Sequence, residues 1–309
     1  MTGTPAIAVI IPCYNEAAAI GAVVRDFRAA LPAARILVFD NNSTDATAEV
    51  ARSAGAEVLP APIQGKGNAV RQAFAAIDAD VYVLVDGDAT YEAAAAPRLV
   101  AALCDGGLDM VIGARRGTAE AAYRAGHRLG NRLLTGLINW LFRGRIDDLL
   151  SGYRVFSRRF VKSFPALAEG FETETELTVH ALALGMPFAE LPTDYGARPE
   201  DSHSKLNTWR DGFRILITAI KLFEKERPLL FFGALTSVFA ATAIILMVPI
   251  FVEFLATGLV PRFPTAILAT GLMILAALSL AAGVVIDAIT HARRELRRLA
   301  YLAIPAPRQ

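Results

Sequence analysis

Two aspartates separated by one glycine, Asp86-Gly87-Asp88, directly follow the apolar run Val81–Val85. In an extended chain, residues i and i+2 point to the same side, so the two carboxylates can share one hard cation. Mg²⁺ and Mn²⁺ favour carboxylate, water and phosphate oxygens, and such an ion neutralises charge that develops on a diphosphate leaving group. The pair predicts a metal-assisted site for a phosphorylated ligand, although the same spacing also occurs in solvated turns.

Further polar clusters follow other apolar runs, and they are Pro12–Glu16, Asp40–Asp45 and Gly113–Arg116. Asp40 is placed to accept hydrogen bonds from the N–H groups of a nucleobase, whereas Asp45 is better explained as a cap of the next helix. The segment Gly65–Asn68 combines flexible backbone with the cation of Lys66 before a helix, which suits either a phosphate or a simple turn.

The apolar runs alternate with stretches of helical periodicity, which is typical of an α/β fold with a mostly parallel sheet and helices on both faces. We expect strands over 6–11, 35–39, 56–59, 81–85 and 109–112, and helices over 17–31, 44–54, 66–77, 93–104 and 124–142. Ligands of such sheets bind outside the carboxyl ends of the strands. The polar clusters are therefore expected to meet at one edge.

Hydrophobic residues make up 54% of the chain and concentrate after Pro228. Leu229–Val252 and Phe263–Ile286 contain no charged residue, and at ~1.5 Å per residue each helix would reach about 36 Å, enough to cross a bilayer. The short connector predicts an antiparallel transmembrane hairpin rather than two core helices of a soluble protein. Basic residues flank its outer ends, and they are Lys221, Lys225, Arg227, Arg293, Arg294, Arg297 and Arg298. By the positive-inside rule, we expect the catalytic domain and the C-terminal tail both to face the cytoplasm.

We expect four segments: a catalytic domain over 1–207, an amphipathic juxtamembrane helix over 208–227, the hairpin over 228–290, and a basic cytoplasmic tail over 291–309. The amphipathic helix suits the membrane surface or packing on the catalytic domain, and these two interpretations are compatible. No signal peptide is expected at the N-terminus. The net charge of +1 gives no argument for nucleic acid, and Cys13 and Cys104 are expected to be free thiols.

The order of the motifs resembles the family 2 glycosyltransferases of the GT-A fold. The stretches that carry this resemblance are Ile11–Glu16, Asp40–Thr47, Gly65–Asn68 and Asp86–Asp88. Later stretches look like the group of dolichol-phosphate mannose synthases and polyprenyl-phosphate glucosyltransferases, and they are Gly113–Arg115, Asp148–Arg154, Phe171–Glu176, Tyr195–Arg198 and Ser204–Leu206.

The resemblance implies transfer of a hexose from a UDP- or GDP-hexose to undecaprenyl or dolichyl phosphate, with Mg²⁺ or Mn²⁺ as cofactor, at the cytoplasmic membrane. It implies that Asp86 and Asp88 hold the metal. It also implies nucleotide contacts from Pro12, Tyr14, Glu16, Asp40 and Lys66, acceptor-phosphate contacts from Arg115, Arg128 and Ser151, and a diphosphate loop with Arg198 and Lys205. Two positions depart from the family pattern, Thr90 after the aspartate pair and Asn41 where a second acid is usual.

An ionised lipid phosphate needs no general base, so we expect a single displacement with inversion at the anomeric carbon and charge compensation by Arg115. A dehydrogenase is excluded by the absence of GxGxxG after the first strand. The alternatives are a processive or other membrane family 2 enzyme that uses a hydroxyl acceptor, and a non-catalytic membrane scaffold. The sequence leaves open whether the protein forms homo-oligomers.

Overall fold

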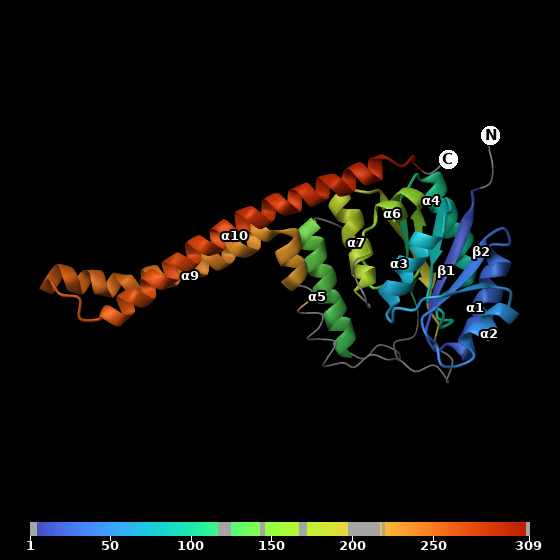
Figure 1. Ribbon diagram of the computed structural model, residues 1–309, viewed down its shortest axis with the longest axis horizontal. Coiled ribbons are helices and arrows are strands. Elements are labelled where there is room, and N and C mark those ends of the chain that lie inside the picture. The colour runs from blue at the N-terminus through green and yellow to red at the C-terminus, as the bar shows by residue number, and fades with distance from the viewer. Residues whose placement is uncertain are drawn as a thin grey trace. The chain divides into compact units, whose positions relative to one another are not determined.

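The computed structural model describes residues 5–116, 125–142, 146–166, 172–196, 217 and 220–306, with side chains in the same ranges except 125–133. The chain forms two compact units, one of Met1–Leu216 with Leu296–Gln309 and one of Ile217–Glu295. The first unit contains the sheet, and the second contains most of the two long C-terminal helices labelled in Figure 1.

The first unit is built on a seven-stranded sheet in the order β3-β2-β1-β4-β6-β5-β7. Its strands are β1 (Ile7–Cys13), β2 (Arg35–Asp40), β3 (Glu57–Pro60), β4 (Val81–Leu84), β5 (Met110–Arg116), β6 (Arg154–Ser157) and β7 (Phe188–Asp194). Among the strands in the described part of the chain, only β6 runs antiparallel to its neighbours. One edge of the sheet therefore collects the carboxyl ends of β1, β2, β4 and β5 together with Arg154, the first residue of β6.

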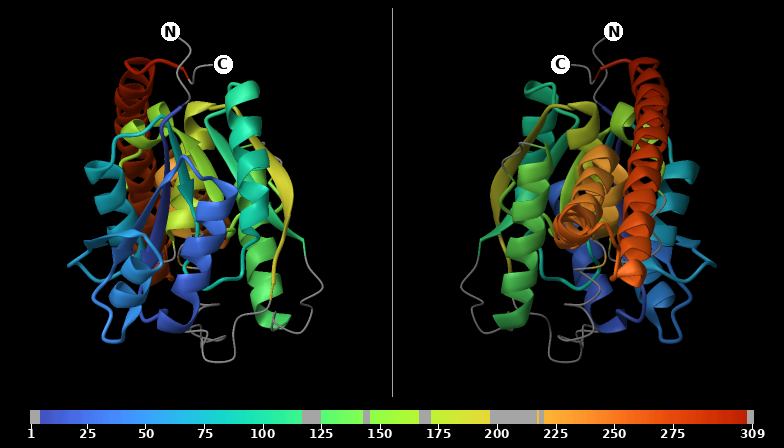
Figure 2. Two further views of the ribbon diagram at one scale, coloured as in Figure 1. Left: turned by 90° about the vertical axis from the view of Figure 1, so that its right-hand side faces the viewer. Right: turned by 90° about the vertical axis from the view of Figure 1, so that its left-hand side faces the viewer.

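Helices cover both faces of this sheet (Figure 2). They are α1 (Ala17–Ala30), α2 (Thr47–Ser53), α3 (Lys66–Ala76), α4 (Ala96–Asp105), α5 (Ala125–Phe142), α6 (Arg158–Ser163) and α7 (Thr173–Leu184). Alternate residues of β1 enter opposite cores: Val9 and Ile11 pack with side chains of α1 and α4, while Ile10 packs with side chains of α3, α6 and α7. The predicted α/β class with a mostly parallel sheet is confirmed.

Two boundaries differ from prediction for local reasons. Helix α2 begins at Thr47 rather than Thr44, because the Asp45 carboxylate accepts the backbone N–H of Thr47 and forms a turn before the helix. Strand β5 continues past Ile112 to Arg116, because the ladder with β7 extends to the pair Arg116 and Asp194.

The second unit contains α9 (Pro228–Thr257) and most of α10 (Phe263–Leu302), which are long and apolar enough to cross a membrane. The two helices lie in contact. A Cβ on Gly283 would approach the Cβ of Phe232 to 2.8 Å, and the Thr236 hydroxyl lies 3.3 Å from the Ala276 carbonyl oxygen. The later residue of α9 contacts the earlier residue of α10, so the two helices are antiparallel, as expected of a hairpin. Most of the predicted amphipathic helix lies outside the described residues.

The last turn of α10 belongs to the first unit. Tyr301 packs against one core cluster, and its hydroxyl donates to Asp109 Oδ2 at 2.8 Å. The Arg159 guanidinium lies over the Tyr301 ring at 4.8 Å and pairs with the fully buried Asp109. Asp109 precedes β5, so this contact lies at the edge opposite the carboxyl end of that strand. The segment predicted as a basic tail therefore contains a packed anchor.

Candidate active site

The predicted polar clusters meet at the edge formed by the carboxyl ends of β1, β2, β4 and β5. The Cys13 thiol lies among them. Burial raises its pKa well above the ordinary value, and four nearby carboxylates raise it further: those of Glu16, Asp86, Asp40 and Asp88. The structure thus gathers the acidic residues of three separate loops around the end of β1.

Asp86 and Asp88 lie in the loop after β4, and one residue separates Asp86 from the end of the strand. Asp88 is buried, and its Oδ1 accepts the Thr90 hydroxyl at 2.6 Å and the Thr90 backbone N–H at 3.2 Å. Thr90 therefore orients the second carboxylate. A Cβ on Gly87 would lie 2.5 Å from Cys13 Sγ, so the residue between the aspartates must be small for the loop to pack on β1.

Lys66, the first residue of α3, joins the carboxylate pair to a distant helix. Its Nζ lies 2.5 Å from Asp86 Oδ1 and 2.5 Å from Glu174 Oε1, in the first turn of α7. Burial alone would lower the pKa of Lys66, but attraction to the two carboxylates outweighs burial and raises it, so the side chain stays charged. Glu174 lies in the stretch Phe171–Glu176 that contributes to the family resemblance, but no pattern in the sequence indicated its contact with Lys66.

Asn41 holds the loop that presents Lys66. Its buried side chain donates to the carbonyl oxygens of Ala61 (2.8 Å) and Ile63 (2.7 Å), and its Oδ1 accepts the Gly65 backbone N–H at 2.6 Å. Gly65 has a φ of 124°, a backbone conformation that residues with a side chain rarely adopt. Only an amide both donates and accepts here, which explains asparagine where the family pattern has an acid.

The loops after β1 and β2 are tied together by side-chain hydrogen bonds. The Asn15 Oδ1 accepts the Thr44 backbone N–H at 2.8 Å, and the Glu16 backbone N–H donates to the Thr47 hydroxyl at 2.8 Å. Asp40 accepts the Ser43 backbone N–H at 3.2 Å. These contacts set the two predicted nucleotide-binding loops side by side.

Three of the predicted nucleotide contacts lie on the first of these loops or beside it. Pro12 lies within β1, Tyr14 exposes 36% of its surface, and Glu16 occupies the N-cap position of α1. Asp45, predicted as a cap, accepts backbone N–H groups from Ala17 at 3.2 Å and Thr47 at 3.0 Å. It therefore supports the starts of both α1 and α2.

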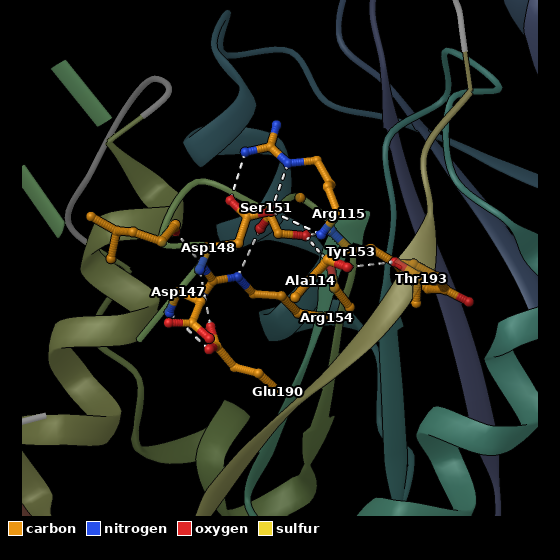
Figure 3. Close-up of polar contacts among 12 residues, drawn as sticks. Ala114, Arg115, Asp147, Asp148, Ser151, Tyr153, Arg154, Glu190 and Thr193 are labelled. Carbon is orange, nitrogen blue, oxygen red and sulfur yellow. Dashed lines mark hydrogen bonds and ion pairs between the residues drawn. The ribbon is translucent and has the colours of Figure 1, made fainter. Parts of the chain in front are cut away.

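Arg115, at the end of β5, is held by Asp148 in a two-bond fork (Figure 3). Its Nε donates to Oδ2 and its Nη2 to Oδ1, both at 2.7 Å, and its backbone N–H adds a third bond at 3.0 Å. The guanidinium also lies 5.4 Å from the centre of the Tyr195 ring. The predicted phosphate-binding cation is thus positioned by a carboxylate from another loop.

The loop 147–154 is held in place by hydrogen bonds between its backbone and the side chains of Glu190 and Arg154. Glu190 on β7 accepts the backbone N–H groups of Asp147 (2.8 Å) and Asp148 (3.3 Å), as Figure 3 shows. The fully buried Arg154 donates to the carbonyl oxygens of Ser151 at 2.9 Å and Leu149 at 2.5 Å. Burial lowers the pKa of Arg154, so the loop encloses a cation at a cost that its carbonyl oxygens offset.

Ser151 forms hydrogen bonds within the protein at this loop. Its side chain is fully buried, its hydroxyl donates to the Gly113 carbonyl oxygen at 2.6 Å, and it accepts the Tyr153 backbone N–H at 3.3 Å. Its hydroxyl therefore fixes the loop, and its contact with the acceptor phosphate stays a prediction.

The same loop touches the aspartate pair. A Cβ on Gly152 would overlap the Asp86 carboxylate, whose Cγ would lie 3.0 Å away, so glycine permits this approach. The Gly152 backbone N–H donates to the Tyr91 hydroxyl at 2.8 Å. Asp86 and the loop that positions Arg115 therefore belong to one site.

Comparison with known proteins identifies the family. Residues 8–164 match the glycosyl transferase family 2 domain. Glycosyltransferase AglJ of Haloferax volcanii is 36% identical over 81% of this chain and 82% of that protein. The chain belongs to glycosyl transferase family 2. A dolichyl-phosphate hexose transferase of Haloferax volcanii is 30% identical to this glycosyltransferase over 72% of the chain and 95% of the relative.

A solved structure shares the fold of this glycosyltransferase. Glucosyl-3-phosphoglycerate synthase from Mycobacterium tuberculosis, crystallised with Mn²⁺, UDP-glucose and phosphoglyceric acid, aligns with a TM-score of 0.58 and 27% identity. The match covers 70% of this chain and 79% of that one. The GT-A fold expected from the motifs is confirmed.

The residues of the glycosyltransferase fit a hard divalent cation. Asp86 and Asp88 would supply carboxylate oxygens, and the Lys66 ammonium beside Asp86 shows that this position already accommodates positive charge. Within the described residues, no group of three or more His, Cys, Asp or Glu side chains could hold a metal, so we expect ligand phosphates and water to complete the shell.

Three predicted site residues cannot be placed. The side chain of Arg128 on α5, and the whole of Arg198 and Lys205, lie outside the described residues. Their assignments to the acceptor phosphate and to a diphosphate loop stay predictions.

Proposed function

We propose that this glycosyltransferase transfers a hexose from UDP- or GDP-hexose to a polyprenyl phosphate, with Mg²⁺ or Mn²⁺ bound by Asp86 and Asp88. The observation that carries the proposal is the convergence of Asp86 and the Arg115–Asp148 fork on the loop 147–154. Carboxylates for a metal–diphosphate and a fixed guanidinium for a second phosphate then lie at one sheet edge. The dolichyl-phosphate hexose transferase relative supports this acceptor class.

The donor half of the site lies around β1, β2 and α3. Asp40 accepts from the nucleobase, Tyr14 and Glu16 line the nucleotide, and Lys66 faces the diphosphate. When bound, the metal ion neutralises the charge that develops on the departing nucleoside diphosphate. The loops after β1 and β2 are already bonded to each other, which reduces the ordering that donor binding requires.

The acceptor half needs charge compensation rather than a base. One phosphate oxygen of the lipid forms a bond to the anomeric carbon as the bond from that carbon to the donor β-phosphate oxygen breaks. The lipid phosphate is already ionised, so no proton has to be removed. Arg115 offsets the repulsion between the two anions and brings the acceptor oxygen in line. The product carries the inverted anomeric configuration.

The membrane part of the proposal rests on α9 and α10. Both are long and apolar enough to cross a membrane, and most of their apolar residues are not buried within the protein. We propose that they form a two-span anchor with the catalytic unit on the cytoplasmic side of the membrane, as the distribution of basic residues predicts.

A water-soluble phosphorylated acid is the second candidate acceptor, because the solved neighbour was crystallised with phosphoglyceric acid. The experiment that decides is transfer from labelled UDP- and GDP-hexoses by the purified chain in detergent, with undecaprenyl phosphate or 3-phosphoglycerate as acceptor. We expect label in the lipid phase only, and loss of transfer with EDTA.

The matched variant Asp88→Asn should reduce transfer at least ~100-fold while the protein still folds. Full transfer with EDTA would contradict the metal role.

Arg115→Ala separates the two halves of the site. Because Arg115 serves the acceptor, we expect KM for undecaprenyl phosphate to rise ~10- to 100-fold, with Kd for the nucleoside diphosphate within about twofold of wild type. Arg115→Lys keeps the charge but loses the planar fork, and should recover only part of the loss. An equal loss of acceptor use and nucleotide binding would contradict the assignment.

A further inference from the structure

Lys66 occupies an unusual position for a residue expected to bind only the nucleotide. Its ammonium lies equally close, at 2.5 Å, to a carboxylate predicted to hold the metal and to a second carboxylate, Glu174, on another element. All three side chains are largely buried, with exposures of 14% for Lys66, 28% for Asp86 and 6% for Glu174. In such surroundings, the contacts between the charges are weakly screened.

Rigid parts of the fold hold the Lys66 ammonium between the two carboxylates. Lys66 is the first residue of α3, and the preceding turn is fixed by three hydrogen bonds to the Asn41 amide. Glu174 is buried in the first turn of α7. Lys66 and Glu174 therefore both start from rigid elements, and the ammonium contacts the carboxylates of Glu174 and Asp86 at the same time.

We infer that Lys66 is a built-in counter-ion of the metal site, which competes with the divalent cation for Asp86 and shifts to Glu174 when the cation binds. This inference rests on the proposed metal role of Asp86 and Asp88. In the absence of nucleotide, the site already contains a cation and has little affinity for a second. A nucleoside diphosphate adds negative charge and phosphate oxygens, so the metal binds together with the nucleotide rather than before it.

Two substitutions should then change metal affinity in opposite directions. Lys66→Met removes the competing charge and keeps most of the side-chain volume, so Mn²⁺ alone should bind more tightly. Glu174→Gln removes the alternative partner, so the ammonium should stay on Asp86 and Mn²⁺ alone should bind less tightly. A purely structural bridge would give the same direction of change in both variants.

The experiment is Mn²⁺ titration of the full chain in detergent, with free Mn²⁺ measured by electron paramagnetic resonance, with and without UDP or GDP. We expect Mn²⁺ alone to bind Lys66→Met at least ~10-fold more tightly than wild type and Glu174→Gln at least ~3-fold less tightly, with the nucleotide enhancement reduced in Lys66→Met. Lys162→Met is the matched control, because that lysine bonds only to backbone oxygens of Phe74 and Ile77 in the described structure, and should leave Kd unchanged.

Unchanged or weaker Mn²⁺ binding by folded Lys66→Met would overturn the inference. If Lys66→Met does not fold, Lys66→Gln and Glu174→Gln decide instead, and tighter or unchanged binding by Glu174→Gln would overturn it. Asp86→Asn separates this inference from the proposed function. If Asp86→Asn binds Mn²⁺ as wild type does, the metal role of Asp86 fails, and the counter-ion role fails with it. If Asp86→Asn loses Mn²⁺ while the two variants move in the same direction, only the counter-ion role fails.

Discussion

At the scale of single residues, Asn41 has a consequence for both folding and donor binding. It donates to two backbone carbonyl oxygens and accepts one backbone N–H, all in the segment that leads to Lys66. An aspartate has the same shape but cannot donate. It would place a carboxylate against the two carbonyl oxygens and leave both without their donor.

We therefore expect Asn41→Asp to lower the free energy of unfolding by about 2–3 kcal/mol and to weaken UDP or GDP binding. Chemical unfolding and nucleotide titration of the purified chain measure both effects. Asn42→Asp is the control, because Asn42 donates to the Pro62 carbonyl oxygen at an exposed position and should cost less than about 1 kcal/mol. An Asn41→Asp protein as stable as the control would show that the amide is not needed.

The sequence identified most of the residues at the sheet edge but not their partners. Three aspartates and one arginine stand at or just after the ends of apolar runs, and they are Asp40, Asp86, Asp88 and Arg115. A strand that ends at each of these points must present them at one edge of the sheet. Glu174 is 108 residues away from Lys66, and no local spacing connects the two. The pairing of Asp148 with Arg115 also depends on an antiparallel strand, β6, that the alternation of strands and helices does not predict.

At the scale of elements, the end of α10 stabilises the catalytic unit through Tyr301. The ring packs on the core and on Arg159, and the hydroxyl donates to Asp109, which is fully buried. The sequence indicated only basic character in this segment, because an anchor of one aromatic residue has no periodicity of its own.

Tyr301→Ala should lower the free energy of unfolding of the catalytic unit by about 2–4 kcal/mol, since it removes both the ring packing and the hydroxyl. Tyr301→Phe should cost about 1 kcal/mol, because Arg159 still pairs with Asp109. Leu302→Ala, at an exposed position next to it, is the control. Thermal unfolding measures all three, and equal effects of Tyr301→Ala and Leu302→Ala would contradict an anchoring role.

His180, a buried residue of α7, leads to a prediction about how the stability of the protein depends on pH. Burial lowers the pKa of this imidazole to about 3, and the positive charge of Arg297 lowers it further. Because the pKa in the folded state lies below the unfolded value, the neutral imidazole contributes its full stability above about pH 6.5, and this contribution is lost as the pH falls toward 3.

We expect the His180 ring resonances in an NMR titration to stay unchanged from pH 8 to pH 5, and the stability advantage of wild type over His180→Gln to shrink below pH 6.5. A ring that titrates near pH 6.5 would show that His180 is not held in its buried, neutral form.

At the scale of the whole molecule, the chain joins a soluble-type catalytic fold to two apolar helices. The hairpin was predictable because a run of 24 uncharged residues has few alternatives in a folded protein. The extent of α10 was not. Its charged C-terminal part continues the helix beyond the apolar run, and its last turn belongs to the catalytic unit.

The proposed orientation can be tested with added cysteines. A cysteine in place of Leu259, in the connector after α9, should react with a membrane-impermeant maleimide on intact cells. A cysteine in place of Ala303 should react only after the membrane is opened. The native Cys13 is buried and Cys104 is half-buried, and both belong to the unit proposed to face the cytoplasm. Labelling of the Ala303 position on intact cells would contradict the orientation.

In the proposed reaction, a hexose passes directly from a nucleoside diphosphate to a lipid phosphate oxygen. The most direct measurement is mass and NMR analysis of the lipid formed from undecaprenyl phosphate and an α-linked UDP- or GDP-hexose by the purified chain. We expect one hexose joined through its anomeric carbon to the lipid phosphate in the β configuration. An α-linked product, or a hexose attached at a hydroxyl with the lipid phosphate unmodified, would contradict it.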